Sequence, residues 1–395
     1  MAEAAEAAPV GESDESKTLE SATPKILESK TSNTLDTYLV PNTDPDRVLA
    51  SIRRVHSVVK HPKADRLSIL NISVIGKPDE ACGWQIVINH EENTCLPGHL
   101  VVYIEIDAVL PVNRPEFAFL SEKCKGRVKT IALRGELSQG LVFPISVLPH
   151  ETLYGEGDDL TKILGVRKFV PLDDRDIYTM GGSATLEFPA KLCQRTEEVR
   201  IQNTDLSVWG KAAGDVMFTE KLHGTSATYI FDSNARLTHV CSRNFVKAQD
   251  DSVWWWIARQ LQKTLSDEKT MEEFKALCPV VVQGEICGPK INDNLYRLPQ
   301  PELYLFTTSD LDFNRHTRAQ TEAVARVLRK PVVPVVADHV DLTSSTPKQI
   351  LSEYADGQSL VNPKSIREGV VGRSNLLSEP QFSFKAVSNR WLSKH

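Results

Sequence analysis

The six residues Glu220-Lys221-Leu222-His223-Gly224-Thr225 determine how the C-terminal half of this chain is interpreted. They follow an alternating strand pattern at 216–220 and place a lysine directly before a turn of small residues, which lets the backbone approach a ligand closely. An amine attacks phosphorus only after it has lost its proton, and free lysine has a pKa near ~10.4. A nucleophilic Lys221 therefore needs burial or neighbouring cations, whereas an exposed lysine at a strand end fits the same pattern when it is read alone.

Five further stretches follow in order along the chain. They supply the other groups needed to break a nucleoside triphosphate at its α-phosphate: cations for phosphate oxygens, carboxylates for a metal or the ribose, and a ring for the base. We expect Arg243 and Lys385 to be the cations that lower the pKa of Lys221. The stretches are Ser242-Arg243-Asn244, Gly284-Glu285-Ile286-Cys287-Gly288, Leu303-Tyr304-Leu305-Phe306, Arg367-Glu368-Gly369-Val370-Val371 and Phe384-Lys385-Ala386-Val387.

Two glutamates are the candidate metal ligands. Glu285 and Glu368 each stand beside glycine at the end of an apolar strand, and we expect those strands to be neighbours. Paired carboxylates suit Mg2+, which keeps several of its waters, or the hydroxyls of a ribose. Ion pairs within the sheet are the structural alternative for both. Phe306 fits a stacking partner for a base and a plain core residue equally well.

The N-terminal half shows short strands with turn residues between them. Strands are expected at 48–59, 67–74, 84–89 and 100–106, a spacing typical of a small β-barrel. The segments His61-Pro62-Lys63-Ala64-Asp65-Arg66-Leu67 and 133–141 resemble the OB-fold module found in tRNA-binding domains. We place an OB-fold, RNA-binding domain at 46–165 and a linker rich in Asp and Gly at 166–187.

The remaining residues, 188–395, mix strand and helix signals without regular alternation. Strands are expected at 216–222, 225–231, 237–241, 280–285, 304–308, 369–372 and 382–387, and helices at 253–265, 271–277, 321–328 and 348–354. The fold class is therefore α+β, with antiparallel sheets and flanking helices.

The series of motifs resembles the covalent nucleotidyltransferase superfamily of polynucleotide ligases and capping enzymes. Most members carry an acid two residues after the nucleophile. This chain carries His223 there instead, and in this it resembles the RNA ligase 2-like branch. The upstream segment Thr196-Glu197-Glu198-Val199-Arg200-Ile201-Gln202-Asn203 resembles the same branch. The last motif usually has two lysines separated by one residue, whereas Ser383 stands here at the earlier place. Only ten residues follow Lys385, which leaves no room for the C-terminal OB domain of DNA ligases and capping enzymes.

The resemblance implies an ATP-dependent RNA ligase with Mg2+ or Mn2+ as cofactor. Lys221 would attack ATP, the resulting AMP would pass to a 5′-phosphate, and a 3′-hydroxyl would displace it, with RNA ends or a nicked duplex as substrate. The implied nucleotide-binding residues are Glu220, Lys221, Leu222, His223, Arg243, Glu285, Phe306, Glu368 and Lys385, with Lys221 and Lys385 catalytic, Glu285 and Glu368 on the metal, and Phe306 stacked on adenine. A guanylyltransferase that caps mRNA and a non-catalytic RNA-binding protein are the alternatives.

A second cluster of cations lies in the N-terminal half. Lys123, Lys125, Arg127 and Lys129 alternate with other residues, which would place all four on one face of a strand. Such a stripe fits a surface that follows an RNA backbone, and it fits equally an edge strand protected by charge. Three consecutive tryptophans at 254–256 point in different directions on a helix, which favours core packing over base stacking.

Composition limits the remaining possibilities. Residues 1–45 carry nine acidic and three basic residues, which is typical of a disordered acidic tail, and the other 350 residues carry 43 of each sign. Any RNA surface must therefore be local. Seven cysteines without paired spacing predict neither a zinc site nor disulfides, and no apolar run is long enough to span a membrane. We expect a soluble intracellular protein, cytoplasmic or nuclear, of undetermined oligomeric state.

Overall fold

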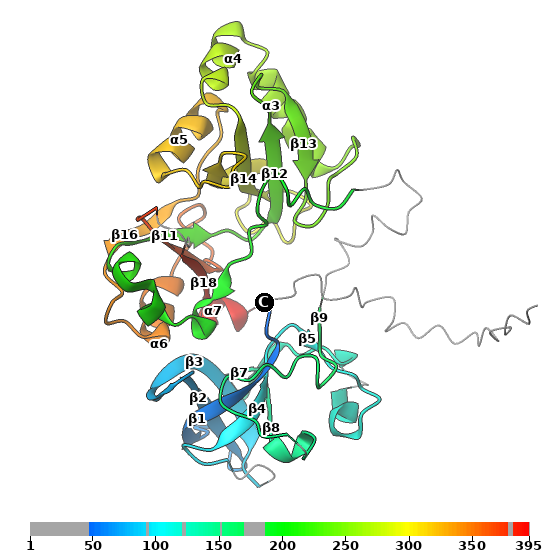
Figure 1. Cartoon of the computed structure of the whole chain (residues 1–395), viewed down its shortest axis with the longest axis vertical. Coiled ribbons are helices and arrows are strands. Elements are labelled where there is room, and N and C mark those ends of the chain that lie inside the picture. Colours follow the sequence, from blue (N-terminus) through cyan, green and yellow to red (C-terminus); the bar gives the residue numbers. More distant parts are fainter. Residues whose placement is uncertain are drawn as a thin grey trace, which may run out of the picture. The chain divides into compact units, whose positions relative to one another are not determined.

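The computed structural model describes residues 47–91, 95–120, 124–150, 152–169, 186–377 and 382–394 (Figure 1). The tail expected at 1–45, most of the linker expected at 166–187, and Lys123 lie outside the described residues.

The N-terminal half is built on a five-stranded antiparallel sheet of order β3-β2-β1-β4-β8. Strand β4 shows why the sheet is buried on both faces: Val102 and Ile104 enter one core cluster, whereas Val101 and Tyr103 enter another. Its strands are β1 (Ala50–Lys60), β2 (Leu67–Val74), β3 (Lys77–Asn89), β4 (Leu100–Ile104) and β8 (Leu141–Phe143), with short 3₁₀ helices η2 (Pro115–Leu120) and η3 (Ile145–Val147) beside them.

Two small strand pairs extend this half. Strand β5 (Ala108–Val109) pairs with β9 (Arg167–Lys168), so the first domain continues past the boundary expected at residue 165. Strands β6 (Thr130–Leu133) and β7 (Glu136–Gln139) form a hairpin.

The expected strand at 123–129 is wrong for the described part of that segment. Lys125 and Gly126 have φ angles of 49° and 79°, which belong to a turn, and strand β6 begins only at Thr130. The cations of this segment therefore do not line one face of a strand.

The C-terminal half contains two sheets, as the α+β fold class predicts. The first, of order β13-β12-β14-β15, is antiparallel and is covered by three helices whose apolar faces enter one core with Tyr229, Phe231 and Phe274 (Figure 1). Its elements are β12 (Thr225–Phe231), β13 (Leu237–Cys241), β14 (Val280–Cys287), β15 (Glu302–Ser309), α3 (Val253–Thr264), α4 (Glu268–Lys275) and α5 (Arg318–Val327).

The second sheet has the order β10-β18-β17-β11-β16, in which only β10 and β18 run parallel. Its strands are β10 (Val199–Arg200), β11 (Val216–Lys221), β16 (Val335–Val340), β17 (Gly369–Ser374) and β18 (Ser383–Val387). Packed around it are η5 (Ile201–Asn203), η6 (Leu206–Gly214), α6 (Pro347–Ile350), the π-helix η7 (Leu351–Ala355) and α7 (Asn389–Leu392).

The tryptophan run lies in α3 and packs on the core of the first sheet, as expected. All three rings are partly buried against that core, and the indole N–H groups of Trp254 and Trp255 donate to the backbone oxygens of Ser226 and Lys247. These rings are therefore structural.

Candidate active site

Lys221 is the last residue of β11 and lies opposite Gly369, the first residue of β17. This register brings Glu368, the residue before β17, beside the lysine, and Nζ of Lys221 donates to Oε1 of Glu368 over 2.5 Å. The second carboxylate, Glu285, belongs to β14 in the other sheet. The expectation that the two glutamates lie on neighbouring strands is therefore wrong, because each comes from a different sheet.

Gly224 lies between β11 of one sheet and β12 of the other and contacts Glu285. Its N–H donates to Oε1 of Glu285 over 3.0 Å, directly after the lysine strand turns into β12. A Cβ at Gly224 would collide with the backbone oxygen of Ile286 and would lie 2.9 Å from both Cγ of Glu285 and Sγ of Cys287. Only glycine permits this close approach, as the turn of small residues predicts.

The three charged groups shift each other's pKa. Burial lowers the pKa of Lys221, but Glu368 and Glu285 raise it more, so the net direction is upward. Burial raises the pKa of Glu368, yet Lys221 and His223 bring it down to about 2. Burial, opposed by Lys221 and reinforced by Glu368, raises the pKa of Glu285 to about 7. Without a ligand, the amine is thus held as an ammonium ion, contrary to the expectation of a neutral lysine.

Lys385 lies in β18, opposite Val371 of β17 and beside Arg200 of the parallel strand β10. Burial lowers its pKa well below the ordinary value, and the charges of Arg200 and Lys221 lower it further. Among the described residues it forms no ion pair. Its charge acts on the nearby carboxylate Glu198, and an anionic ligand would further stabilise the charged form of this buried side chain.

Ser383 stands where the last motif usually has its first lysine, and its side chain forms a structural hydrogen bond. Oγ of Ser383 donates to Oε2 of Glu198, whose other oxygen accepts from Nη2 of Arg373 over 2.8 Å. Ser383 thus belongs to a buried polar cluster and has no charge to offer a phosphate.

Arg243 follows β13 and forms an ion pair with Glu197, its side chain remaining partly exposed. Its charge also lowers the pKa of Glu285, which places it in the electrostatic neighbourhood of the carboxylates. The sequence did not assign a role to Glu197 or Glu198, although both lie in the segment that resembles the RNA ligase 2-like branch.

An apolar wall adjoins the lysine. Leu222 is buried in a cluster with Cys287, Tyr296 and Val333, and Phe306 packs against this cluster. The guanidinium of Arg373 lies 5.6 Å from the centre of the Phe306 ring, and a cavity of about 270 Å³ opens beside that ring. Among the proposed nucleotide-binding residues only Phe306 lines this cavity, so the cavity does not decide between base stacking and core packing for its ring.

His223 contacts the acidic centre and two aromatic residues. Its N–H donates to the hydroxyl of Tyr296 over 2.7 Å, its Nδ1 lies 3.5 Å from Oε2 of Glu368, and its ring meets Trp391 at 5.1 Å between centres. Sequence reasoning missed Tyr296 and Trp391, because neither belongs to a motif.

Glu220 has a different environment from the other candidates. Its side chain is buried, and Oε2 accepts the N–H of Leu360 over 2.7 Å. Burial raises the pKa of this carboxyl against the opposing effect of Ser359. In this structure Glu220 holds the loop before β17, and its part in nucleotide binding stays a prediction.

The acidic pair fits a magnesium or manganese ion. The described residues contain no group of three or more His, Cys, Asp or Glu side chains that converge as metal ligands. Mg2+ needs fewer, because it is usually held by one or two carboxylates together with water and substrate phosphates. Oε2 of Glu368 is buried, and its nearest printed partner is Nδ1 of His223 at 3.5 Å, so this oxygen keeps acceptor capacity for a hydrated cation.

Comparison with known proteins identifies the family. Residues 49–145 match the family model of an OB-fold domain, and residues 214–387 match that of RNA ligase. The structure is similar to that of a glutamate-to-alanine variant of the Naegleria gruberi RNA ligase with AMP and Mn, at 30% identity and a TM-score of 0.71 over 88% of this chain and 99% of that chain. The chain belongs to the RNA ligase family.

Two further structures of the Naegleria ligase support the assignment of this chain to the RNA ligase family. A lysine-to-alanine variant of the same Naegleria protein with ATP and Mn matches at 29% identity and a TM-score of 0.71, and the protein with PPi matches at 29% and 0.70. Both alignments cover 88% of this chain and 99% of that chain. The search among curated proteins gives no match.

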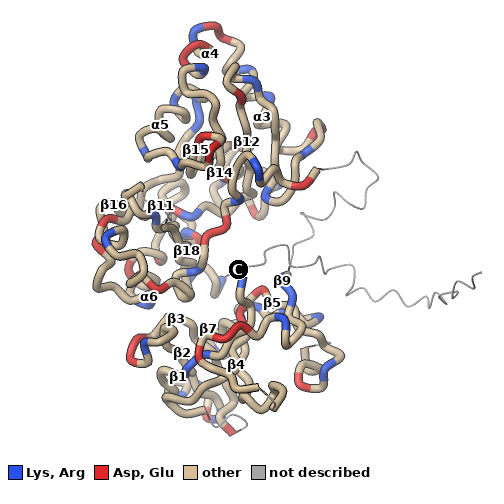
Figure 2. Tube along the Cα trace, viewed as in Figure 1, with Lys and Arg blue, Asp and Glu red and all other residues tan. Residues whose placement is uncertain are grey.

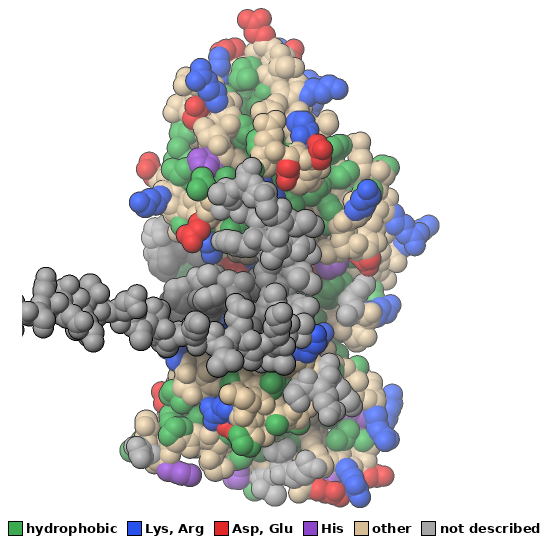
Figure 3. Space-filling view, turned by 90° about the vertical axis from the view of Figure 1, so that its right-hand side faces the viewer, with side chains coloured by type: hydrophobic (Ala, Val, Ile, Leu, Met, Phe, Trp, Pro, Cys, Tyr) green, Lys and Arg blue, Asp and Glu red, His purple; other side chains and the backbone are tan. Residues whose placement is uncertain are grey.

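The charged surface of the ligase is mixed. Figure 2 shows Lys and Arg interspersed with Asp and Glu along the chain, and on the face seen in Figure 3 the coloured basic side chains form no continuous field. Arg127, one of the cations proposed for RNA, donates a hydrogen bond to Asp107 over 2.8 Å, and its guanidinium lies 3.5 Å from the centre of the Phe169 ring.

Among the described residues, no helix is long and apolar enough to cross a membrane.

Proposed function

We propose that this RNA ligase joins RNA 3′-hydroxyl and 5′-phosphate ends through a lysyl-AMP intermediate, with Lys221 as the nucleophile. The observation that carries the proposal is the position of its amine: Nζ lies at the end of β11, paired with Glu368 and in the field of Glu285, in the same sheet as the unpaired cation Lys385. This arrangement of an amine, carboxylates and a second lysine supports covalent nucleotidyl transfer.

The first step is the attack of Lys221 on the α-phosphorus of ATP. The nitrogen–phosphorus bond forms as the bond to pyrophosphate breaks, and the amine must first lose the proton that Glu368 and Glu285 now retain on it. A bound Mg2+ or Mn2+ would neutralise these carboxylates and stabilise charge on the phosphate. Lys385 faces the phosphate as a cation, Arg243 adds positive charge near Glu285, and Phe306 stacks on adenine.

The second and third steps use the same groups. AMP passes from Lys221 to the 5′-phosphate of an RNA strand, which regenerates the free amine. The adjacent 3′-hydroxyl then attacks that 5′-phosphate, the phosphodiester bond forms, and AMP leaves. A nick in a duplex with RNA on the 3′-hydroxyl side is the substrate that presents the two ends together.

The test is the mass of the intact protein after incubation with ATP or GTP and Mg2+. We expect the wild-type protein and Lys263→Ala, a matched change at an exposed lysine of α3, to gain one AMP from ATP. Lys221→Ala gains none, and the purified AMP adduct seals a nicked RNA duplex without further ATP. A mass gain from GTP alone indicates a capping enzyme, and no mass gain from either nucleotide indicates a binding protein.

A further inference from the structure

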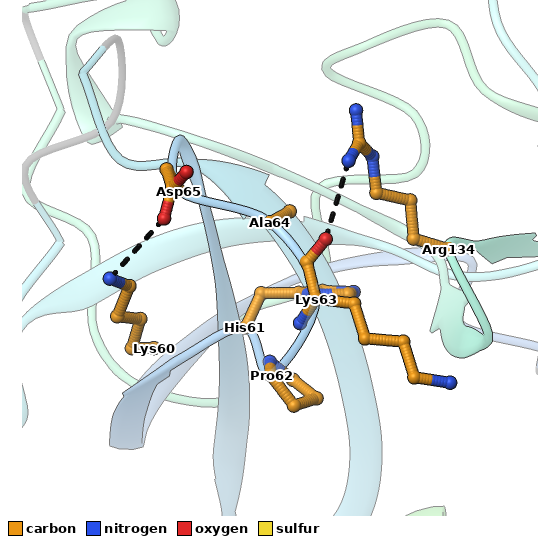
Figure 4. A pocket seen from close by; sticks show the side chains of 7 residues that line it. All are labelled: Lys60, His61, Pro62, Lys63, Ala64, Asp65 and Arg134. Carbon is orange, nitrogen blue, oxygen red and sulfur yellow. Dashed lines mark hydrogen bonds and ion pairs between the residues drawn. The ribbon is translucent and has the colours of Figure 1, made fainter.

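A polar pocket of about 400 Å³ lies on the N-terminal domain, in a part of the chain that the proposed chemistry does not use. It lies between the loop that joins β1 to β2 and the turn of the β6–β7 hairpin (Figure 4). Its lining residues are Lys60, His61, Pro62, Lys63, Ala64, Asp65 and Arg134.

A buried histidine holds the two walls of the pocket together. His61 is only 1% exposed; its Nδ1 accepts the N–H of Lys63 over 3.0 Å, and its Nε2 is 3.0 Å from the backbone oxygen of Leu133. Because Nδ1 accepts, the proton lies on Nε2, which donates to Leu133. The loop is thus fastened to the hairpin by the His61 ring, which fixes the two walls of the pocket relative to each other.

Two cations from segments that are far apart in sequence lie at the rim, and their charged ends point in different directions (Figure 4). Arg134 and Gly135 form the hairpin turn with φ angles of 49° and 95°, and Nη1 of Arg134 donates to the backbone oxygen of Lys63 over 3.3 Å (Figure 4). A Cβ at Gly135 would lie 3.5 Å from Nζ of Lys63, so the ammonium group of Lys63 lies next to the hairpin turn.

The charge at this rim is available to a ligand. Within the described residues neither Lys63 nor Arg134 forms an ion pair. Lys60 pairs with Asp65 at 3.5 Å, but both side chains are largely in water, at 73% and 99% exposure, where such a pair contributes little. Arg127, by contrast, is already bound to Asp107.

We propose that this pocket binds the phosphate backbone of the RNA substrate through Lys63 and Arg134, each cation contacting a phosphate. The inference rests on the proposed function, which supplies RNA as the ligand. A prearranged polar hollow with two unpaired cations suits a phosphate that retains part of its water, and the loop between the first two strands of an OB-fold is a common site of contact with oligonucleotides. Since the folded part of the chain is charge-balanced, such local sites must supply the attraction.

The test compares two double variants of the full chain. Lys63→Ala with Arg134→Asn removes both cations, and asparagine tolerates the left-handed backbone at 134. Lys162→Ala with Arg167→Asn is the matched control, since it makes the same replacements at exposed positions of the same domain. Binding of a nicked RNA duplex is measured by fluorescence anisotropy from low to high salt.

We expect the pocket variant to bind more weakly at low salt, with a slope of log K against log salt that is smaller by about one unit per lost phosphate contact. The control should keep the wild-type slope. Equal slopes for the two variants would overturn the proposal. Inorganic phosphate at constant ionic strength should not displace the RNA; displacement at millimolar phosphate would show a site for the free anion instead.

Lysyl-AMP formation separates this inference from the proposed function. The pocket variant should acquire AMP from ATP at the wild-type rate, because the pocket has no part in the first step. Loss of lysyl-AMP together with RNA binding, at an unchanged melting temperature, would place these residues in the nucleotide site and contradict the proposal. Absence of lysyl-AMP in the wild-type protein would defeat the proposed function while leaving the binding measurement interpretable.

Discussion

At the scale of single residues, two carboxylates keep Lys221, the proposed nucleophile, in its protonated and unreactive form. The pKa of Lys221 is raised because two carboxylates outweigh the effect of burial, and Oε1 of Glu368 accepts a hydrogen bond from its ammonium group over 2.5 Å. Reactivity therefore depends on whatever neutralises Glu368 and Glu285. This coupling would restrict the attack to a centre that already holds its ligands.

Changing Glu368 to Gln separates the two effects of this carboxylate. Lys221 should become more reactive towards an amine-acylating reagent at neutral pH, because its pKa falls, while lysyl-AMP formation falls by roughly 100-fold, as expected when one charge that supports the transition state is removed. Peptide mass mapping and intact mass measure the two outcomes. Glu322→Gln, which removes an exposed carboxylate paired with Arg318, is the control. Unchanged acylation of Lys221 would contradict the pKa argument.

Substitutions of Phe306 distinguish stacking of its ring on adenine from simple packing of the ring in the core. Loss of one base–aromatic stack costs about 1–3 kcal/mol, so Phe306→Leu should raise the KM for ATP by roughly 5- to 150-fold. Phe306→Tyr keeps the ring and should restore the wild-type KM. If the leucine variant lowers the melting temperature without a change in KM, the ring is only part of the core.

At the scale of elements, the contact between β12 and β14 sets the position of Glu285. Because a Cβ at Gly224 meets the backbone of β14, Gly224→Ala should force these strands apart and abolish the hydrogen bond to Glu285. We expect lysyl-AMP formation to drop by at least about 10-fold, since small displacements at a reacting centre are costly. The control is Gly214→Ala, where a Cβ meets only Cγ2 of Thr343, at 3.9 Å. Equal rates in both variants would refute the positioning role.

The junction of β17 and β18 is stabilised by the buried pair of Glu198 and Arg373. Burial raises the pKa of Glu198, but Arg373 and the hydrogen bond from Ser383 lower it more. The ionised form therefore stabilises the fold above the unfolded-state pKa of about 4.5, and this contribution disappears as the pH falls through the lower folded-state value.

Glu198→Gln should destabilise the protein by about 3–5 kcal/mol at pH 7, because it leaves the Arg373 charge buried without a partner. Its melting temperature should also depend less on pH below about 4.5 than that of the wild-type protein. Calorimetry across this pH range measures both effects. Glu273→Gln, at an exposed and loosely paired position of α4, should change neither. Parallel pH profiles for wild type and Glu198→Gln would argue against the pair.

At the scale of the whole molecule, the charges are divided unequally. Residues 1–45 carry the net charge of −6, whereas the rest of the chain is neutral overall. Acidic residues joined to the chain repel RNA over distances up to about the ~10 Å Debye length at 0.1 M salt.

Removal of residues 1–45 should thus tighten RNA binding at low salt and have no effect at about 0.5 M salt, where charges are screened. Lysyl-AMP formation should not change. A full-length protein whose nine acidic tail residues are replaced by their amides should bind RNA as tightly as the truncated one. A different affinity for these two proteins would show that the length of the tail matters, and not its charge.

Local patterns determined most elements of this ligase. Strands β12 and β13 begin and end where alternation and turn residues predicted, and β11 begins as predicted but ends at Lys221, one residue before the expected end at 222. Strand β16 was not predicted, because it is an edge strand with no buried residue and no clear apolar alternation. The 3₁₀ segment η6 was also missed, since its break at Gly210 interrupts any helical period.

The sequence by itself determined which groups we propose to react, because the proposed nucleophile, carboxylates and cations each stand in a short motif whose residue types follow from the chemistry. Only the tertiary structure decided how they meet. Glu285 and Glu368 come from different sheets, and the protonation of Lys221 depends on charges 64 and 147 residues away in sequence. A local pattern contains neither strand order nor distance through space, and electrostatic energy depends on both.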